Sequence, residues 1–90
     1  MKRVNAFRMV SDDGFAVEFK MPDRVLYEEG EDQLRIGMEN MLDTWAIYYP
    51  TGTRWRSGLQ VSDSEAKRIM ANVEAAMAYM CDNYQVIQDK

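Results

Sequence analysis

A single amphipathic helix, entered through a capping box, is the feature of this 90-residue sequence that most constrains its fold. Ser62 stands three residues before Glu65, so its hydroxyl is placed to accept from the Glu65 backbone N–H while the Glu65 carboxylate accepts from the Ser62 N–H. Apolar side chains then recur at helical spacing on one face: Ala66, Ile69, Met70, Val73, Ala76, Met77 and Met80. The pattern predicts a helix over residues 63–81 whose apolar face has to be covered.

The segments outside this helix alternate with the period of strands. Residues 4–10 predict a first strand, and residues 15–21 predict a second one, joined to the first by a turn at residues 11–14. Further strands are predicted over these shorter ranges: 25–27, 33–38, 44–49, 53–56 and, at the sheet edge, 84–87. A turn is predicted over residues 39–43. The sequence therefore predicts an α+β fold, in which a mostly antiparallel meander of about five to six strands is packed by one helix and followed by a short last strand.

Length and composition limit the class of protein. Ninety residues predict a single domain over positions 1–90, since two cores would each be too small. The formal net charge of −4 argues against a protein that binds the phosphate backbone of nucleic acid. No apolar run has the length of a membrane span, and the N-terminus lacks the apolar region of a signal peptide. The single cysteine, Cys81, is predicted to be a small buried hydrophobe in a reducing compartment, so we expect a cytoplasmic protein.

The absence of histidine bears on chemistry. Histidine is the side chain most often used for proton transfer near neutral pH and the commonest metal ligand, and this chain has none. One cysteine without histidine does not match the usual zinc spacings. We therefore predict no enzyme, no metal and no cofactor. A small-ligand binder or an enzyme that uses carboxylates such as Glu18 or Glu39 remains an alternative.

An acidic segment at residues 28–32 is the first candidate site. Six carboxylates lie between positions 28 and 43 against one arginine, Arg35. The segment is predicted to be a solvated loop with no role in the core; a calcium loop is disfavoured because the required ligand spacing is missing. The alternative is a surface that mimics phosphate charge and plugs a basic cleft in a partner. Its partner-binding residues are then Glu28, Glu29, Glu31 and Asp32.

An aromatic and arginine-rich segment is the second candidate. Tyrosine, tryptophan and arginine are enriched at interface hot spots. We expect Trp45 and Trp55 to lie in the core, and Tyr48, on the opposite strand face from Trp45, to be exposed. Arg54 and Arg56 are predicted to share one face of a short strand, where they would lie beside Tyr48 and clamp a carboxylate. Single-stranded nucleic acid also suits such residues, but the net negative charge disfavours it.

Four local motifs follow one another along the chain: Gly14 in the first turn, Trp55-Arg56-Ser57-Gly58, the Ser62 and Glu65 cap with Ile69 and Val73 behind it, and the closing Tyr84-Gln85-Val86-Ile87. This order resembles the small immunity proteins of bacterial polymorphic-toxin systems. The resemblance implies a short α+β domain that neutralises a toxin by binding it directly. It transfers no contact residues, because such surfaces follow the particular toxin.

These observations lead to one expected function and two alternatives. The expected function is a non-catalytic binding protein that neutralises a toxin or other enzyme by occluding it. The first alternative is a structural or regulatory interaction domain, including a homodimer that pairs through an edge strand or a Met-rich surface. The second is the small-ligand binder or carboxylate-based enzyme named above. The expected partner is a protein, rather than nucleic acid or a membrane.

Overall fold

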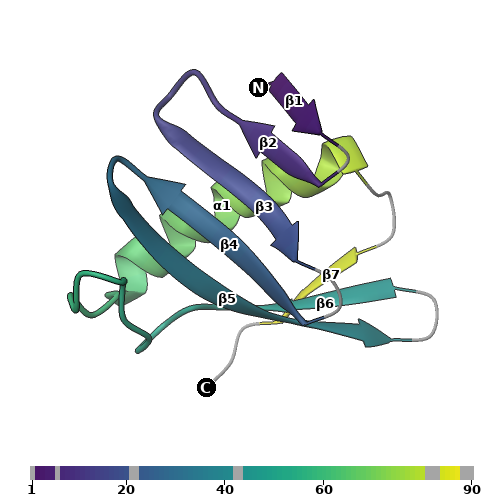
Figure 1. The fold of residues 1–90 in the computed structure, drawn as a ribbon. Helices are drawn as coiled ribbons and strands as arrows, with labels where there is room; N and C mark the ends of the chain where they lie inside the picture. Colours follow the sequence, from purple (N-terminus) through teal and green to yellow (C-terminus); the bar gives the residue numbers. More distant parts are fainter. Residues whose placement is uncertain (1, 6, 21–22, 42–43, 81–83, 88–90) are drawn as a thin grey trace.

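The computed structural model describes residues 2–5, 7–20, 23–41, 44–80 and 84–87, and it shows an α+β fold (Figure 1). Within these residues the strands lie side by side in sequence order, and β1 to β6 form an antiparallel meander. One helix, α1 (Asp63–Met80), crosses behind the strands and covers one face of the sheet. The predicted fold class and the mostly antiparallel meander are confirmed.

The N-terminal segment differs from its prediction. Instead of one strand over residues 4–10, the chain forms β1 (Lys2–Asn5) and β2 (Arg8–Val10), which pair antiparallel. The Asn5 side-chain Oδ1 accepts from the Phe7 backbone N–H at 2.9 Å, and this local hydrogen bond competes with a continuing strand. The predicted hairpin partner is present: β3 (Phe15–Lys20) pairs with β2. Met21, predicted as the end of that strand, lies outside the described residues.

The acidic segment is a tight hairpin rather than a loop. β4 (Arg24–Glu29) and β5 (Asp32–Met41) pair up to Glu29 opposite Asp32, which leaves two residues for the turn. Gly30 has φ of +60°, the value that a type II′ hairpin turn needs at its first central position. Strand alternation then sends neighbouring carboxylates to opposite faces of the sheet. The predicted solvated loop was wrong because it ignored this hydrogen-bonded turn.

Strand β5 serves two neighbours and is longer than predicted. Its first half pairs with β4, and Met38 to Met41 pair with β6 (Thr44–Tyr48), so the predicted turn over residues 39–43 begins too early; residues 42 and 43 lie outside the described residues. The predicted last strand at the sheet edge is present as β7 (Tyr84–Ile87), and it pairs parallel with β6. The predicted strand over residues 53–56 was wrong. Only an isolated bridge between Arg54 and Gln60 forms there among the described residues.

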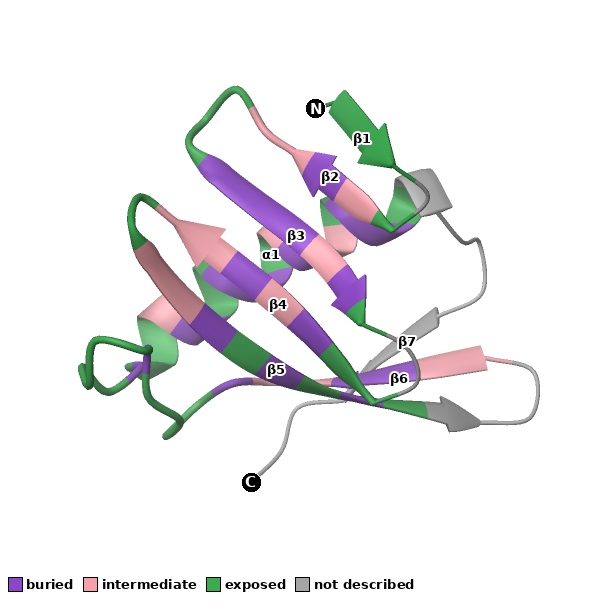
Figure 2. Ribbon diagram, in the orientation of Figure 1, coloured by how far each residue is buried: buried purple, intermediate pink, exposed green. Residues whose placement is uncertain are grey.

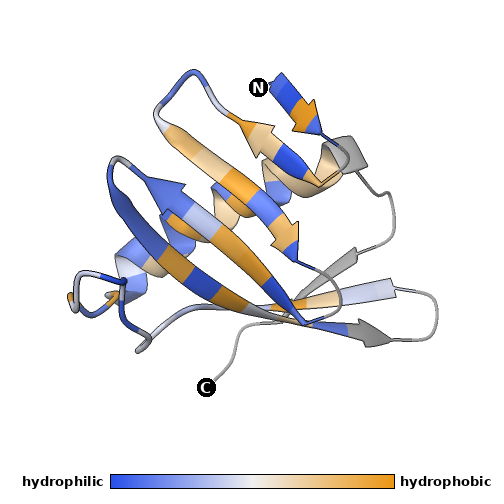
Figure 3. Cartoon of the chain, viewed as in Figure 1, coloured by the Kyte–Doolittle hydropathy of each residue, from blue (hydrophilic) through white to orange (hydrophobic). Residues whose placement is uncertain are grey.

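The core lies between the sheet and α1. Alternate residues of the strands point toward the helix and are buried, which Figure 2 shows as purple bands and Figure 3 as orange ones. The helix contributes the predicted apolar stripe as far as Met77. Its capping box is present, since Glu65 N donates to Ser62 Oγ and Ser62 N donates to Glu65 Oε1, each at 3.2 Å. Cys81, predicted as the last helical residue, lies outside the described residues.

Candidate functional site

The sheet face opposite α1, which we call the outer face, carries the candidate site. Along β5 the side chains of Leu34 and Ile36 are buried toward the helix, so Arg35 and Gly37 face outward. After β6 the chain turns back. Residues 49–62, which we call the returning segment, pass beside the first half of β5, where the Arg56 backbone N–H donates to the Gln33 carbonyl at 2.7 Å. The outer face therefore continues from β5 onto this returning segment.

Trp55 fixes the orientation of the returning segment. Its ring is 6% exposed and lies against Tyr27, with ring centroids 6.0 Å apart. Because Trp55 points into the core, its neighbours Arg54 and Arg56 both project to solvent. The prediction for Trp55 is confirmed, since it belongs to the core cluster, whereas Trp45 is only partly buried and packs against that cluster.

Four side chains line a hollow of about 300 Å³ on this face: Gln33, Arg35, Arg54 and Arg56. We call it the arginine hollow. Arg54 Nη1 donates to the Gly58 carbonyl, and Arg56 Nη2 donates to the Glu31 carbonyl, both at 3.0 Å. These bonds anchor two of the guanidinium groups on backbone oxygens and leave their other N–H groups for a ligand.

The arginines of this hollow differ from others in the chain. Arg8, Arg24 and Arg68 each form an ion pair with a carboxylate. Within the described residues, no carboxylate lies within 4.0 Å of a guanidinium nitrogen of Arg35, Arg54 or Arg56. A net-acidic chain therefore displays three arginines that are not neutralised by direct contact.

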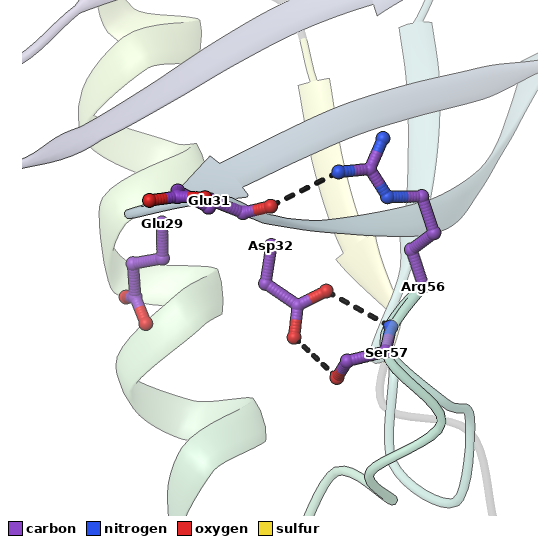
Figure 4. A pocket seen from close by; sticks show the side chains of 5 residues that line it. All are labelled: Glu29, Glu31, Asp32, Arg56 and Ser57. Carbon is purple, nitrogen blue, oxygen red and sulfur yellow. Dashed lines mark hydrogen bonds between the residues drawn. The ribbon is translucent and has the colours of Figure 1, made fainter.

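A second hollow, of about 430 Å³, adjoins the first and shares Arg56 (Figure 4). We call it the carboxylate hollow; it is lined by Glu29, Glu31, Asp32, Arg56 and Ser57. Asp32 accepts from the Ser57 hydroxyl at 2.5 Å and from the Ser57 backbone N–H at 3.1 Å. These hydrogen bonds lower the pKa of Asp32 below its ordinary value, and the positive charge of Arg56 adds to the effect. Asp32 is thus held ionised.

Glu28 belongs to an ionic network on the outer face. Arg8 bridges two carboxylates, with Nη2 2.7 Å from Glu28 Oε1 and Nη1 2.9 Å from Glu18 Oε1. Gln33 Nε2 donates to the other oxygen of Glu28 at 3.0 Å. The hydrogen bond from Arg8 outweighs partial burial and lowers the pKa of Glu28. The Glu28 carboxylate is therefore bound to side chains of the domain itself.

Glu29 faces the opposite way, toward the helix. It forms an ion pair with Arg68 of α1 and accepts from the Tyr27 hydroxyl at 2.6 Å. Asn72 Nδ2 in turn donates to the same hydroxyl at 2.8 Å. Burial and the Glu29 carboxylate raise the pKa of Tyr27 well above its ordinary value, so the phenol remains a neutral donor. This cluster ties the β4–β5 hairpin to the helix.

Tyr48 lies on the outer face, as strand alternation predicted, but it is half-buried rather than exposed because its ring packs over Gly37. A side-chain carbon of Tyr48 lies 3.5 Å from the position that a Cβ would take at Gly37, so the ring covers this glycine. Its hydroxyl donates to Glu39 Oε1 at 2.6 Å. Gly37 follows Arg35 by two positions along β5, so Tyr48 lies on the same face of the sheet as the arginine hollow.

The predicted site residues thus fall into two groups. Arg54 and Arg56 lie on the outer face with Tyr48, but beside Gln33 and Arg35 of β5 rather than on a short strand beside Tyr48; the role of all three in partner binding stays a prediction. The acidic residues are dispersed: Glu28 faces outward in its ionic network, Glu29 faces α1, Glu31 lies in the hairpin turn, and Asp32 follows it as the first residue of β5. Sequence reasoning missed Gln33 and Arg35, although strand alternation had already placed Arg35 outward.

Comparison with known protein families, curated proteins and solved structures finds no match to this chain. The local geometry therefore carries the functional argument. Over the described ranges no three acidic or cysteine side chains gather closely enough to hold a metal ion. In the same ranges, no helix combines the length and apolar character that crossing a bilayer requires.

Proposed function

We propose that this chain is a non-catalytic binding protein that occludes a cytoplasmic protein partner, in the manner of an immunity or inhibitor protein. The contact surface is the arginine hollow together with the adjoining carboxylate hollow. The observation that carries the proposal is that three arginines, none in contact with a carboxylate of the described residues, line one hollow beside the exposed carboxylate of Glu31. Adjacent surfaces of opposite charge favour one partner and one orientation.

The groups in this surface suit recognition better than proton transfer. Arginine stays protonated across the physiological range, so it holds an anion without exchanging protons. A general base needs a pKa near the working pH, whereas hydrogen bonds lower the pKa of Asp32 away from it. With no histidine in the sequence, these side chains support binding rather than acid–base catalysis.

Residue types at the surface also support a protein partner. Arginine and tyrosine are enriched at interface hot spots because they combine a large contact area with a polar end. Tyr48 lies on the same face as the arginine hollow, and Leu59, 69% exposed, belongs to the same returning segment as Arg54 and Arg56. A protein contact would desolvate these side chains together and strengthen the charged hydrogen bonds they make.

The test is co-expression with each protein encoded beside this chain in its genome. We expect one neighbour whose toxicity to the host cell is relieved by this chain and which forms a complex with it. Arg54→Gln and Arg56→Gln should each weaken that complex by about 2 kcal/mol, as at a hot spot. The matched control is Lys67→Gln, which removes one exposed positive charge from α1. Equal binding by all three variants would refute this contact surface.

A test of the acidic residues has to replace one side chain, because most of them also stabilise the fold. Glu28, Glu29 and Asp32 take part in internal hydrogen bonds, so replacing them would also destabilise the fold. Glu31→Gln changes an exposed carboxylate of the turn instead. At low salt it should slow association with the partner and reduce the dependence of the rate on ionic strength. An unchanged rate would remove Glu31 from the contact surface.

A further inference from the structure

The Arg8 network next to the arginine hollow, linked to it through Gln33, does not cancel its charge. Glu18 and Glu28 are paired with Arg8, and Lys20 Nζ lies 3.0 Å from Glu18 Oε2. Two carboxylates are thus matched by two cations within this network. It has no surplus negative charge with which to neutralise the neighbouring hollow.

Charge within the hollow is unevenly compensated. Arg56 lies near the carboxylates of Glu28 and Asp32, and its field contributes to lowering the pKa of each after their hydrogen bonds to Arg8 and Ser57. Neither Arg35 nor Arg54 forms an ion pair within 4.0 Å with a carboxylate of the described residues. An incoming anion would therefore find these two guanidinium groups without a carboxylate in direct contact.

We propose that the arginine hollow binds a phosphate monoester carried on a side chain of the partner. That the phosphate is carried by a protein partner rests on the proposed function, whereas the choice of phosphate is argued from the arginine hollow alone. A single carboxylate has one charge and two oxygens, and one guanidinium fork satisfies it. A phosphate monoester carries a charge of about −1.5 to −2 and three acceptor oxygens, which matches guanidinium groups arriving from several directions.

The shape of the site agrees with a group of this size. At about 300 Å³ the hollow is at the small end of ligand pockets, enough for one phosphorylated side chain. Its arginines come from two backbone segments: Arg35 from β5, and Arg54 and Arg56 from the returning segment. The carbonyl contacts of Arg54 and Arg56 hold their side chains in place before a ligand arrives, which lowers the entropy cost of binding.

The test uses a glycine-flanked phosphoserine peptide, blocked at both ends, titrated into the full chain by calorimetry. The expected result is saturable binding that Arg54→Lys weakens about tenfold, because lysine keeps the charge and loses the fork. Lys67→Gln should bind as wild type does. The same peptide with glutamate in place of phosphoserine should bind at least about tenfold more weakly than the phosphopeptide.

A pH series adds a readout that a general loss of structure would not give. Affinity should rise between about pH 5 and 7 as the phosphate gains its second charge near pH 6. Sulfate keeps its double charge over this range, and a protein without histidine has no unperturbed side chain that titrates there. Sulfate affinity should therefore stay level.

Three results would overturn the proposal: no saturable phosphopeptide binding, equal binding of the glutamate peptide, or equal binding by Arg54→Lys. The two hypotheses fail separately. If Arg54→Gln loses the protein partner but wild type ignores the phosphopeptide, the contact surface stands and the phosphate site falls. If the phosphopeptide binds while the partner tolerates Arg54→Gln, the phosphate site stands and the proposed contact surface falls.

Discussion

Removing the Tyr27 hydroxyl tests how the hairpin is attached to the helix. The Tyr27 ring is fully buried, and its hydroxyl donates to Glu29 at 2.6 Å while accepting from Asn72 at 2.8 Å. Tyr27→Phe keeps the ring and leaves a half-buried carboxylate and an amide each short of one bond. The substitution therefore isolates one hydroxyl.

The expected cost follows from these two hydrogen bonds. A bond to a charged group contributes about 1.5–3 kcal/mol, and one between neutral groups about 0.5–1.5 kcal/mol. Glu29 and Asn72 are both half-buried, so water can reach them and replace part of what is lost. We expect a net loss of about 2 kcal/mol, which in a domain of this size lowers the melting midpoint by about 10 °C.

Urea unfolding at pH 7 measures this loss, with Glu29→Gln and the double variant completing a cycle. Burial raises the pKa of Glu29, but hydrogen bonds from Arg68 and Tyr27 outweigh it and lower the pKa overall. Glu29 therefore stabilises the fold fully above the unfolded pKa of about 4.3 and loses this effect as the pH falls through its folded value. The difference between wild type and Tyr27→Phe should shrink over that interval. A loss below about 0.5 kcal/mol at pH 7, or a difference that does not shrink at all as the pH falls below the unfolded pKa of Glu29, would refute the reasoning; the part due to the Asn72 hydrogen bond should remain.

Three further predictions concern the helix and the outer face. Ser62→Ala should cost about 0.5–2 kcal/mol by removing the cap, which helical circular dichroism melts would show; an unchanged midpoint would contradict the capping role. Ile69→Ala should cost about 2–5 kcal/mol in urea, because this fully buried side chain would leave a cavity, while Lys67→Ala on the exposed face should stay within about 0.5 kcal/mol. Trp45→Ala should lower the free energy of unfolding by about 3 kcal/mol and Tyr48→Ala by about 1 kcal/mol. Only Tyr48→Ala should weaken partner capture by more than its loss of stability explains. A larger stability loss for Tyr48→Ala than for Trp45→Ala would mean that the two faces of β6 are assigned the wrong way round.

Local features of the sequence predicted the helix and the strand faces well. The capping box involves residues three apart, and the burial of Phe15, Val17 and Phe19 follows from alternation within one strand. The break after Asn5 was missed because the Phe7 backbone N–H donates to the Asn5 side chain, which interrupts a strand that alternation alone would continue. Alternation and strand propensity do not show whether a side-chain hydrogen bond to the backbone will interrupt a strand.

The candidate site was harder to predict because it depends on partners distant in sequence. Arg8 binds carboxylates ten and twenty positions away, and Arg68 binds Glu29 across the gap between helix and hairpin. The sequence did place Arg54 and Arg56 on one face. It did not place Arg35 beside them, because this depends on the returning segment pairing with β5 at Gln33.

The parallel pairing of β6 with β7 has a consequence for the order in which the chain assembles. Each of the hairpins from β1 to β6 joins neighbours in sequence and closes a short loop. The β6–β7 ladder instead pairs Trp45 with Tyr84, so its ends meet only after the returning segment and α1 have been ordered between them. Closing so long a loop is entropically costly before the intervening core is formed. β7 is therefore expected to dock last, and until it does β6 presents an open edge to which another extended chain can add.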